Sequence, residues 1–318
     1  MTVKTLTPWL LSIAMAMVVS ASAMADIVEC YREGPTVILK NHTVHMVFSP
    51  ADGGRCVSLR MAPFGLDNEL TVKPEAPTDD GGLMADTFWF PQAKNLQDRV
   101  YSYTTLGDAR SRSIHFVTRV GGNLEFLELH KTVSLSADSS RIRVVYAFHN
   151  RRESYADYFI GFQARHELRL AGRRPEVVVP MPGGAVRRKP GEGAAKEFVN
   201  PAGDWMAMVW DKTALLLKTD YAYLEAFAYA PSAVITRKMM VKCGDTFSMN
   251  LSFEPVAGFG AETIRRLGEN ALRVEKKGVS RKAEQDASGE YYLSMRVEKP
   301  RTSNGPALIQ AVRSRRWS

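Results

Sequence analysis

Residues 36–261 form one short extended run after another, and this pattern constrains the fold more than any other feature of the chain. In residues 124–135 polar and apolar side chains alternate, with one interruption at Lys131. Residues 141–148 alternate in the same way. A period of two, with β-branched and aromatic residues, is typical of half-buried strands. Many such strands with little helix predict an all-β sandwich or barrel of antiparallel strands.

The first 25 residues have the features of a secretory signal peptide. Lys4 precedes an apolar run over residues 10–19, and the segment ends in Ala21-Ser22-Ala23-Met24-Ala25 before Asp26. This combination is typical of a signal peptide that is cleaved, here after Ala25. The run is shorter than the roughly 20 apolar residues that a membrane span needs, although an uncleaved anchor is the alternative. We therefore predict a periplasmic or extracellular protein.

Downstream of the strand-rich region the pattern changes. Residues 261–277 place apolar side chains at helical spacing, and the chain beyond them turns polar before one more extended run at 291–297. We predict three parts: a signal peptide (1–25), a β domain (26–261), and a basic helical or extended C-terminal segment, partly disordered (262–318). Within the β domain, the Gly- and Pro-rich residues 181–193 predict a loop.

The net charge of +8 lies mainly in the C-terminal segment, where 13 Lys and Arg face 7 Asp and Glu. The β domain is close to neutral, and no aromatic-rich basic motif or zinc-finger spacing occurs. We therefore expect no nucleic-acid partner. The basic tail predicts a weak contact with an anionic membrane surface.

Cys30, Cys56 and Cys243 are the only cysteines. An oxidising compartment permits one disulfide with one thiol left over, and three unpaired thiols are the alternative. None of the three has the spacing of metal ligands, so we predict no metal and no cofactor.

Four segments together resemble the galactose mutarotase-like supersandwich, the fold of aldose 1-epimerases. They are residues 49–59, the acidic-aromatic stretch 81–89, the hairpin 129–150 that ends in an Asn, and the late turn 241–247. The resemblance covers about 41–260. It implies a large antiparallel β-supersandwich, here with a short C-terminal helix and an extension. It also implies that residues 81–89 form an aromatic loop at the mouth of the sheet.

Enzymes of this family interconvert sugar anomers with a histidine acid and a carboxylate base, which act on opposite sides of one ring. The resemblance implies that His166 is the acid and Glu225 the base, with Glu254 as second choice for the base. The early His-Gly-Gly motif of the family is absent here, which motivates sugar binding without turnover.

From the chemistry of the side chains we expect sugar contacts at Asp86, Trp89, Arg99 and Arg165. Aromatic faces stack on sugar rings and carboxylates accept hydrogen bonds from hydroxyls. Arg165 begins a cluster that continues with Arg169, Arg173 and Arg174, which predicts affinity for an acidic sugar. For each residue the alternative is a structural role, in the core or on a solvated face.

Three hypotheses follow. The first is an exported carbohydrate-binding protein that holds a sugar or polysaccharide fragment in a cleft on a sheet face. The second is an enzyme on the same scaffold, either an aldose 1-epimerase-like isomerase or a polysaccharide-processing enzyme. The third is a non-catalytic interaction protein of the cell envelope. The orientation of His166 separates them, because an imidazole that points into the core favours binding or a structural role.

Overall fold

The computed structural model describes residues 27–73, 81–91, 96–122, 124–152, 158–192, 197–276, 280–285 and 291–296. The expected signal peptide and the end of the basic tail lie outside these residues. The chain divides into two compact units, Met1–Phe259 and Gly260–Ser318. The first unit contains the predicted supersandwich, and the second contains helix α2 (Ala261–Lys276) with a two-stranded sheet of β20 (Ser280–Gln285) and β21 (Tyr291–Arg296).

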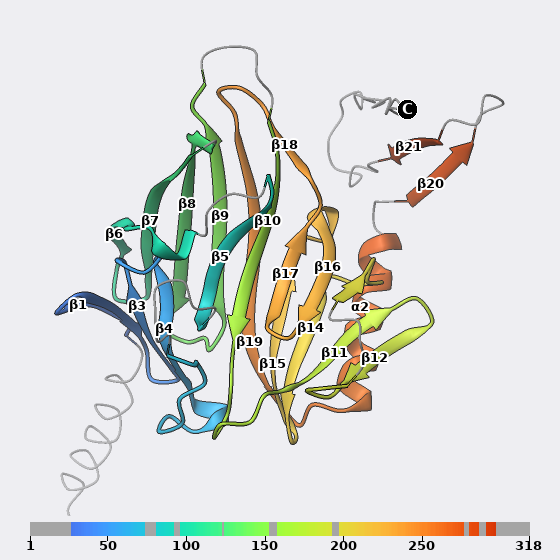
Figure 1. The fold of residues 1–318 in the computed structure, drawn as a ribbon. Coiled ribbons are helices and arrows are strands. Elements are labelled where there is room, and N and C mark those ends of the chain that lie inside the picture. The colour runs from blue at the N-terminus through green and yellow to red at the C-terminus, as the bar shows by residue number, and fades with distance from the viewer. Residues whose placement is uncertain are drawn as a thin grey trace, which may run out of the picture. The chain divides into compact units, whose positions relative to one another are not determined.

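A ten-stranded sheet forms one layer of the first unit (Figure 1). Its strands lie side by side in the order β1 (Glu29–Glu33), β2 (Thr36–Lys40), β3 (Val44–Ser49), β4 (Arg55–Met61), β5 (Gly82–Phe90), β10 (Tyr158–Glu167), β17 (Ser232–Thr236), β16 (Leu224–Tyr229) and β13 (Glu197–Val199), with β18 (Met239–Val241) also paired to β10.

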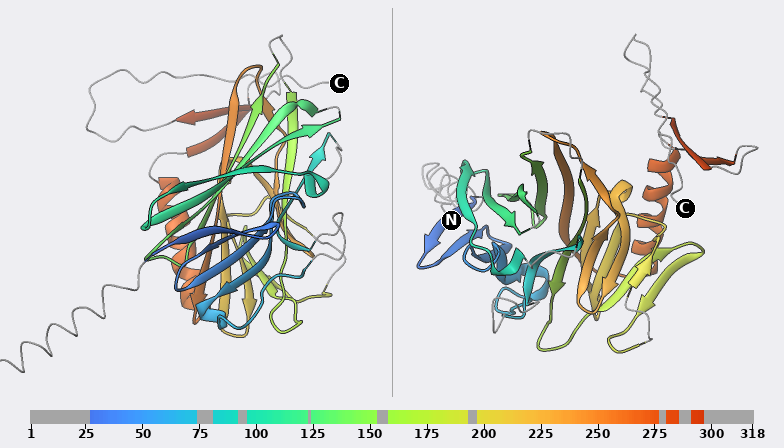
Figure 2. Two further views of the ribbon diagram at one scale, coloured as in Figure 1. Left: turned by 90° about the vertical axis from the view of Figure 1, so that its left-hand side faces the viewer. Right: turned by 45° about the horizontal axis from the view of Figure 1, so that its top comes forward.

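A nine-stranded sheet forms the other layer, and the two sheets pack face to face (Figure 2). Its strands follow the order β12 (Gly184–Arg188), β11 (Glu176–Met181), β14 (Trp205–Trp210), β15 (Thr213–Thr219), β19 (Thr246–Ala257), β9 (Ile142–Asn150), β8 (Leu124–Ser136), β7 (Ser111–Gly121) and β6 (Ser102–Gly107). Three short 3-10 turns, η1 (Ala62–Phe64), η2 (Leu96–Asp98) and η3 (Tyr221–Tyr223), join strands. The predicted fold class is confirmed.

Strand alternation builds the core between the sheets. In β8 the odd-numbered side chains from Leu127 to Leu135 point inward and are buried, whereas Glu128, His130 and Thr132 point outward. Lys131 occupies an inward position and is fully buried. The residue that interrupts the apolar series in the sequence is therefore part of the core.

Two local predictions are wrong. Residues 82–90 form the central strand β5 rather than a loop, because Asp86 and Phe88 find partners inside the sandwich. Within the predicted loop 181–193, residues 184–188 form strand β12, which pairs with β11 through backbone hydrogen bonds that need no particular side chains.

The three cysteines carry free thiols, which settles the disulfide alternatives in favour of unpaired cysteines. Burial raises the pKa of the Cys56 thiol to about 12, so this group is inert at neutral pH. Within the described part of the chain, no helix has the length and apolar character needed to cross a membrane.

Candidate functional site

His166 lies on β10 and points into the space between the two sheets, where it is fully buried. Its Nδ1 accepts a hydrogen bond of 3.2 Å from the backbone N–H of Met84, so the proton of the neutral ring sits on Nε2. The imidazole meets the ring of Phe253 edge to face at 5.0 Å. Burial lowers the pKa of His166 to about 3. The ring is therefore neutral at physiological pH and enclosed by the core.

The two carboxylates considered as its partner lie on the surface. Glu225, on β16, is about two-fifths exposed and lies 3.8 Å from the Nε of Arg237. Glu254, on β19 of the other sheet, forms a 2.6 Å ion pair with Arg141. The structure does not bring either carboxylate to a shared cleft with the buried imidazole. A catalytic pair built on His166 stays a prediction that this geometry does not support.

Asp86, expected among the sugar contacts, is also inside the core. Its Oδ2 lies 2.8 Å from the Nζ of Lys131 on β8, and its Oδ1 accepts a 2.7 Å hydrogen bond from the hydroxyl of Tyr146. Lys131 also donates to the carbonyl of Gly53 at 3.1 Å. Burial raises the pKa of Asp86 and lowers that of Lys131, and the attraction between the two charges opposes both shifts. This ion pair links the two sheets and is shielded from solvent.

Trp89 occupies the opposite, outer face of the ten-stranded sheet. Its indole Nε1 donates a 2.9 Å hydrogen bond to the carbonyl of Thr236, and the ring lies directly over Gly161 on β10. A side chain at Gly161 would collide with it, because a Cβ there would sit 2.3 Å from Trp89 Cε2. Two residues back along β10, Phe159 is 51% exposed, and it faces Met240 of β18, which is 44% exposed. The three side chains form an apolar patch on this face.

Arg165 lies on the same outer face, further along β10. Its cross-strand neighbours are Ala85 on β5 and Ala233 on β17, and Ala233 is in turn opposite Ala228 on β16. These three alanines are buried, and the guanidinium beside them is half-buried. The next row places polar Thr87 and Gln163 side by side, followed by Ile235 and Ala226. We call Trp89, Phe159, Gln163, Arg165 and Met240 the outer-face surface.

The other predicted cationic contacts lie elsewhere. Arg99 packs its guanidinium against Gly121, at the end of β7. Arg169 and Arg174 both contact the carboxylate of Glu167. Arg173 pairs with Asp211 at 3.0 Å, beside a hollow of about 540 Å³ next to Trp210. Of the four clustered arginines, only Arg165 belongs to the outer-face surface.

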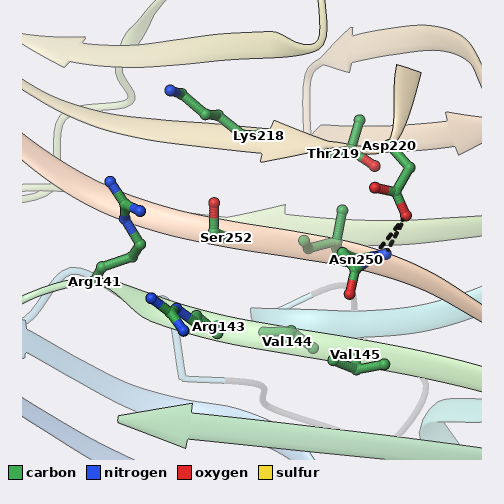
Figure 3. Close-up of a pocket in the computed structure, with 10 residues that line it drawn as sticks. Arg141, Arg143, Val144, Val145, Lys218, Thr219, Asp220, Asn250 and Ser252 are labelled. Carbon is green, nitrogen blue, oxygen red and sulfur yellow. Dashed lines mark hydrogen bonds between the residues drawn. The ribbon is translucent and has the colours of Figure 1, made fainter. Parts of the chain in front are cut away.

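A basic groove that the sequence reasoning missed lies on the outer face of the nine-stranded sheet (Figure 3). It has a volume of about 460 Å³. Lys218, Ser252 and Arg143 form one cross-strand row over β15, β19 and β9, and no carboxylate in the described residues pairs with either cation. At the other end of the groove, Asp220 accepts two hydrogen bonds from Asn250. The outward arginines of residues 141–148 were the sequence signal for this groove.

Comparison with known proteins agrees with the architecture. The structure of a putative aldose 1-epimerase from Klebsiella pneumoniae superposes with a TM-score of 0.54 at 10% identity, covering 78% of this chain and 87% of that one. A TPR-domain containing protein from Parabacteroides distasonis gives 0.50 at 12% identity, over 71% of this chain and 47% of its own length, so this chain spans about half of it. A galactose 1-epimerase from Lactobacillus acidophilus gives 0.45 at 12% identity, over 73% and 98%.

No protein-family profile and no curated protein sequence matches the chain. At 9–12% identity the structural likeness establishes the fold, and the activity must be argued from the site. The chain has the galactose mutarotase-like fold, which confirms the fold that the resemblance in the sequence implied.

Proposed function

We propose that this chain is an exported carbohydrate-binding protein, which holds a sugar or a polysaccharide fragment against the outer-face surface and does not convert it. One observation carries the proposal. Trp89 and Arg165 share the outer face of the ten-stranded sheet, whereas His166 and Asp86 face the core. Trp89 is exposed and Arg165 is half-buried on this face, whereas the group suited to proton transfer is enclosed.

The outer-face surface has the chemistry that sugar recognition requires. The C–H face of a pyranose ring stacks on aromatic side chains, and Trp89 and Phe159 offer two such rings. Sugar hydroxyls need donors and acceptors in a fixed arrangement, and the half-buried side chains of Gln163 and Arg165 supply them from β10. Because these side chains stand on paired strands, their spacing is rigid.

The length of the surface favours more than one sugar ring. Gly161, under the indole of Trp89, and Arg165 are four residues apart on β10, which corresponds to about 13 Å at the usual rise of a strand. An oligosaccharide laid along β10 would stack at one end and meet a cation at the other. A carboxylate on the sugar at that end would gain a charge-assisted hydrogen bond from the guanidinium.

Turnover by the family's acid–base route needs a titratable pair on one cleft. With a pKa of about 3, His166 is a neutral imidazole at neutral pH and lacks the acidic imidazolium proton that a general acid would give to a ring oxygen, and the core encloses it. We therefore expect the protein to leave the rate of anomer exchange of free aldoses unchanged in polarimetry. An accelerated rate that His166→Gln abolishes would replace the binding proposal with an isomerase.

Binding is tested with the mature chain, residues 26–318, by thermal shift followed by calorimetry against neutral and uronic oligosaccharides. A ligand that binds only the folded state raises the melting temperature with concentration. Phe159→Ala and Arg165→Ala should each raise the dissociation constant about tenfold or more, which corresponds to a loss of about 1.4 kcal/mol of binding free energy. Trp89→Phe, which keeps a ring but loses the bond to Thr236, should give a smaller loss.

Arg143→Ala and Val145→Ala are matched controls, because they remove an arginine and an apolar side chain from the outer face of the other sheet. Both should bind as the wild type does. If these controls lose binding while the outer-face variants keep it, the basic groove of Figure 3 is the sugar site. If no sugar shifts the melting temperature, the sugar proposal is refuted and a cell-envelope interaction role takes its place.

A further inference from the structure

A chain of hydrogen bonds runs across the outer face of the nine-stranded sheet, outside every site considered above. His115 on β7 and His130 on β8 are diagonal neighbours, since Val117 is opposite His130 and Thr132 is opposite His115. Both side chains point outward, because the residues on either side of each histidine along its own strand are buried in the core. The two imidazoles come together with 5.2 Å between ring centres.

Each imidazole has a further hydrogen-bond partner at its second ring nitrogen, on the side away from the other ring. The Nδ1 of His115 lies 2.9 Å from the hydroxyl of Thr132. The Nε2 of His130 lies 2.8 Å from Oε1 of Glu128, and Oε2 of the same carboxylate is held by Arg151 at 2.6 Å. The remaining nitrogens, Nε2 of His115 and Nδ1 of His130, face each other at 3.2 Å. The two imidazoles thus hydrogen-bond to each other through these nitrogens, and the outer partner of each ring fixes its orientation.

We propose that His115 and His130 form a two-nitrogen site for a borderline divalent cation such as Zn²⁺, Cu²⁺ or Ni²⁺. Imidazole is a preferred ligand of these ions. At a Zn–N distance of 2.0–2.1 Å, two nitrogens of a tetrahedral site are about 3.3 Å apart, which is close to the separation seen here. Water fills the other coordination positions. Among the described residues no group of three or more His, Cys, Asp or Glu could hold a metal, so the affinity is that of a two-ligand site.

The outer partners match what a metal-bound histidine requires. A ligating histidine donates its second ring N–H to a carboxylate or another acceptor, which fixes the tautomer and the orientation of the ring. Glu128 does this for His130. For His115 the Thr132 hydroxyl serves, because it can accept a hydrogen bond from Nδ1–H as well as donate one.

When the metal binds the two neutral imidazoles, no proton is released to solvent. Without metal, the proton on Nε2 of His115 bridges to Nδ1 of His130. With metal, that proton moves to Nδ1 of His115 and bonds to Thr132, while His130 keeps its proton on Nε2 toward Glu128. An imidazole ligates a metal in its neutral form, and with both rings neutral the number of protons is the same in both states.

The site is tested on untagged mature protein with one equivalent of Cu²⁺, by electron paramagnetic resonance, and with Zn²⁺ by calorimetry. We expect one bound ion per chain and a copper spectrum with nitrogen couplings. His115→Gln and His130→Gln should each weaken the affinity at least tenfold. Glu128→Gln and Thr132→Val, which leave both ligands in place, should weaken it by 10- to 100-fold.

His149→Gln is the matched control. His149 lies on β9 opposite Glu128, and its Nδ1 contacts the hydroxyl of Thr246. Its loss should leave metal binding unchanged. Each variant is checked for an unaltered circular dichroism spectrum without metal, so that lost affinity is not lost folding. The proposal is overturned if neither ion binds, if both single histidine variants retain wild-type affinity, or if His149→Gln loses as much affinity as they do.

Discussion

The ion pair between Lys131 and Asp86 should dominate the response of this sandwich to core mutation. Neither side chain has any solvent exposure, and their 2.8 Å contact joins β8 of one sheet to β5 of the other. Lys131→Met keeps an unbranched apolar side chain of similar length but leaves a buried carboxylate without its counter-charge. Removing one partner of a buried pair costs about 3–5 kcal/mol, a large fraction of the 5–15 kcal/mol that stabilises a typical domain.

A further signature separates this mechanism from a simple packing defect. Burial already raises the pKa of Asp86, and loss of the Lys131 charge removes the main opposing effect. A carboxyl whose pKa is higher in the folded state than in the unfolded state favours folding below its unfolded pKa, and loses that contribution as pH rises through the folded value. The loss of unfolding free energy caused by Lys131→Met should therefore be smallest in acid and should grow toward neutral pH.

The complementary variant removes the whole polar group. In Lys131→Met/Asp86→Leu/Tyr146→Phe no charge and no orphaned hydroxyl remains among these side chains. Replacing a buried ion pair with apolar residues is often neutral or stabilising. We expect this triple variant to be more stable than Lys131→Met alone. Urea unfolding, followed by circular dichroism between pH 5 and 8 with m-values compared, measures both effects. The reasoning would be falsified if Lys131→Met lost less than about 1 kcal/mol, or if the triple variant were no better than the single one.

Three other outcomes follow from the structure. His166→Gln should flatten the pH dependence of the free energy of unfolding. The pKa of His166 is about 3 in the folded protein and near 6.5 in the unfolded chain, so the wild type loses about 1.4 kcal/mol of stability per pH unit as the pH falls between these values. Urea midpoints from pH 6 to 4 measure this loss. Gly161→Ala should push the Trp89 indole off the sheet, raise its accessibility to acrylamide quenching and weaken sugar binding; unchanged quenching contradicts this. Asn41→Ala should cost about 1–3 kcal/mol in thermal or urea unfolding, because the amide nitrogen of Asn41 donates to the carbonyls of Ser136, Ala137 and Ser139, at the end of β8 and in the turn after it; a loss within error would show those bonds contribute nothing.

The fold was largely predictable because strand patterning is a local property. The runs at 124–135 and 141–148 appear as β8 and β9, and the helical spacing at 261–277 appears as α2. The errors arose where tertiary partners override local composition. Residues 82–90 looked like a polar aromatic loop because the partner that makes Asp86 acceptable in a core strand, Lys131, is 45 residues away.

The candidate site was predicted only in part, for the same reason. Trp89 and Arg165, both predicted to contact a sugar, lie on one sheet face, but Asp86 and His166 were expected beside them and face the other way. The alternation of side chains along a strand predicts that His166 and Arg165 point to opposite faces of the sheet. It does not predict which of the two faces is covered by the second sheet. The pairing of His115 with His130 was likewise absent from the sequence reasoning, because strand register decides it.

By itself the sequence determined most of the strands, the all-β class, and that basic charge gathers in the C-terminal segment, since each of these depends on neighbours within a few residues. Only the tertiary structure decided that Lys131 and Asp86 are a buried pair, that His166 is enclosed with a pKa near 3, and that two histidines on adjacent strands meet at 3.2 Å. Burial, charge pairing and ligand geometry depend on distances across the sheets, and those distances exist only once the strands have been paired and stacked.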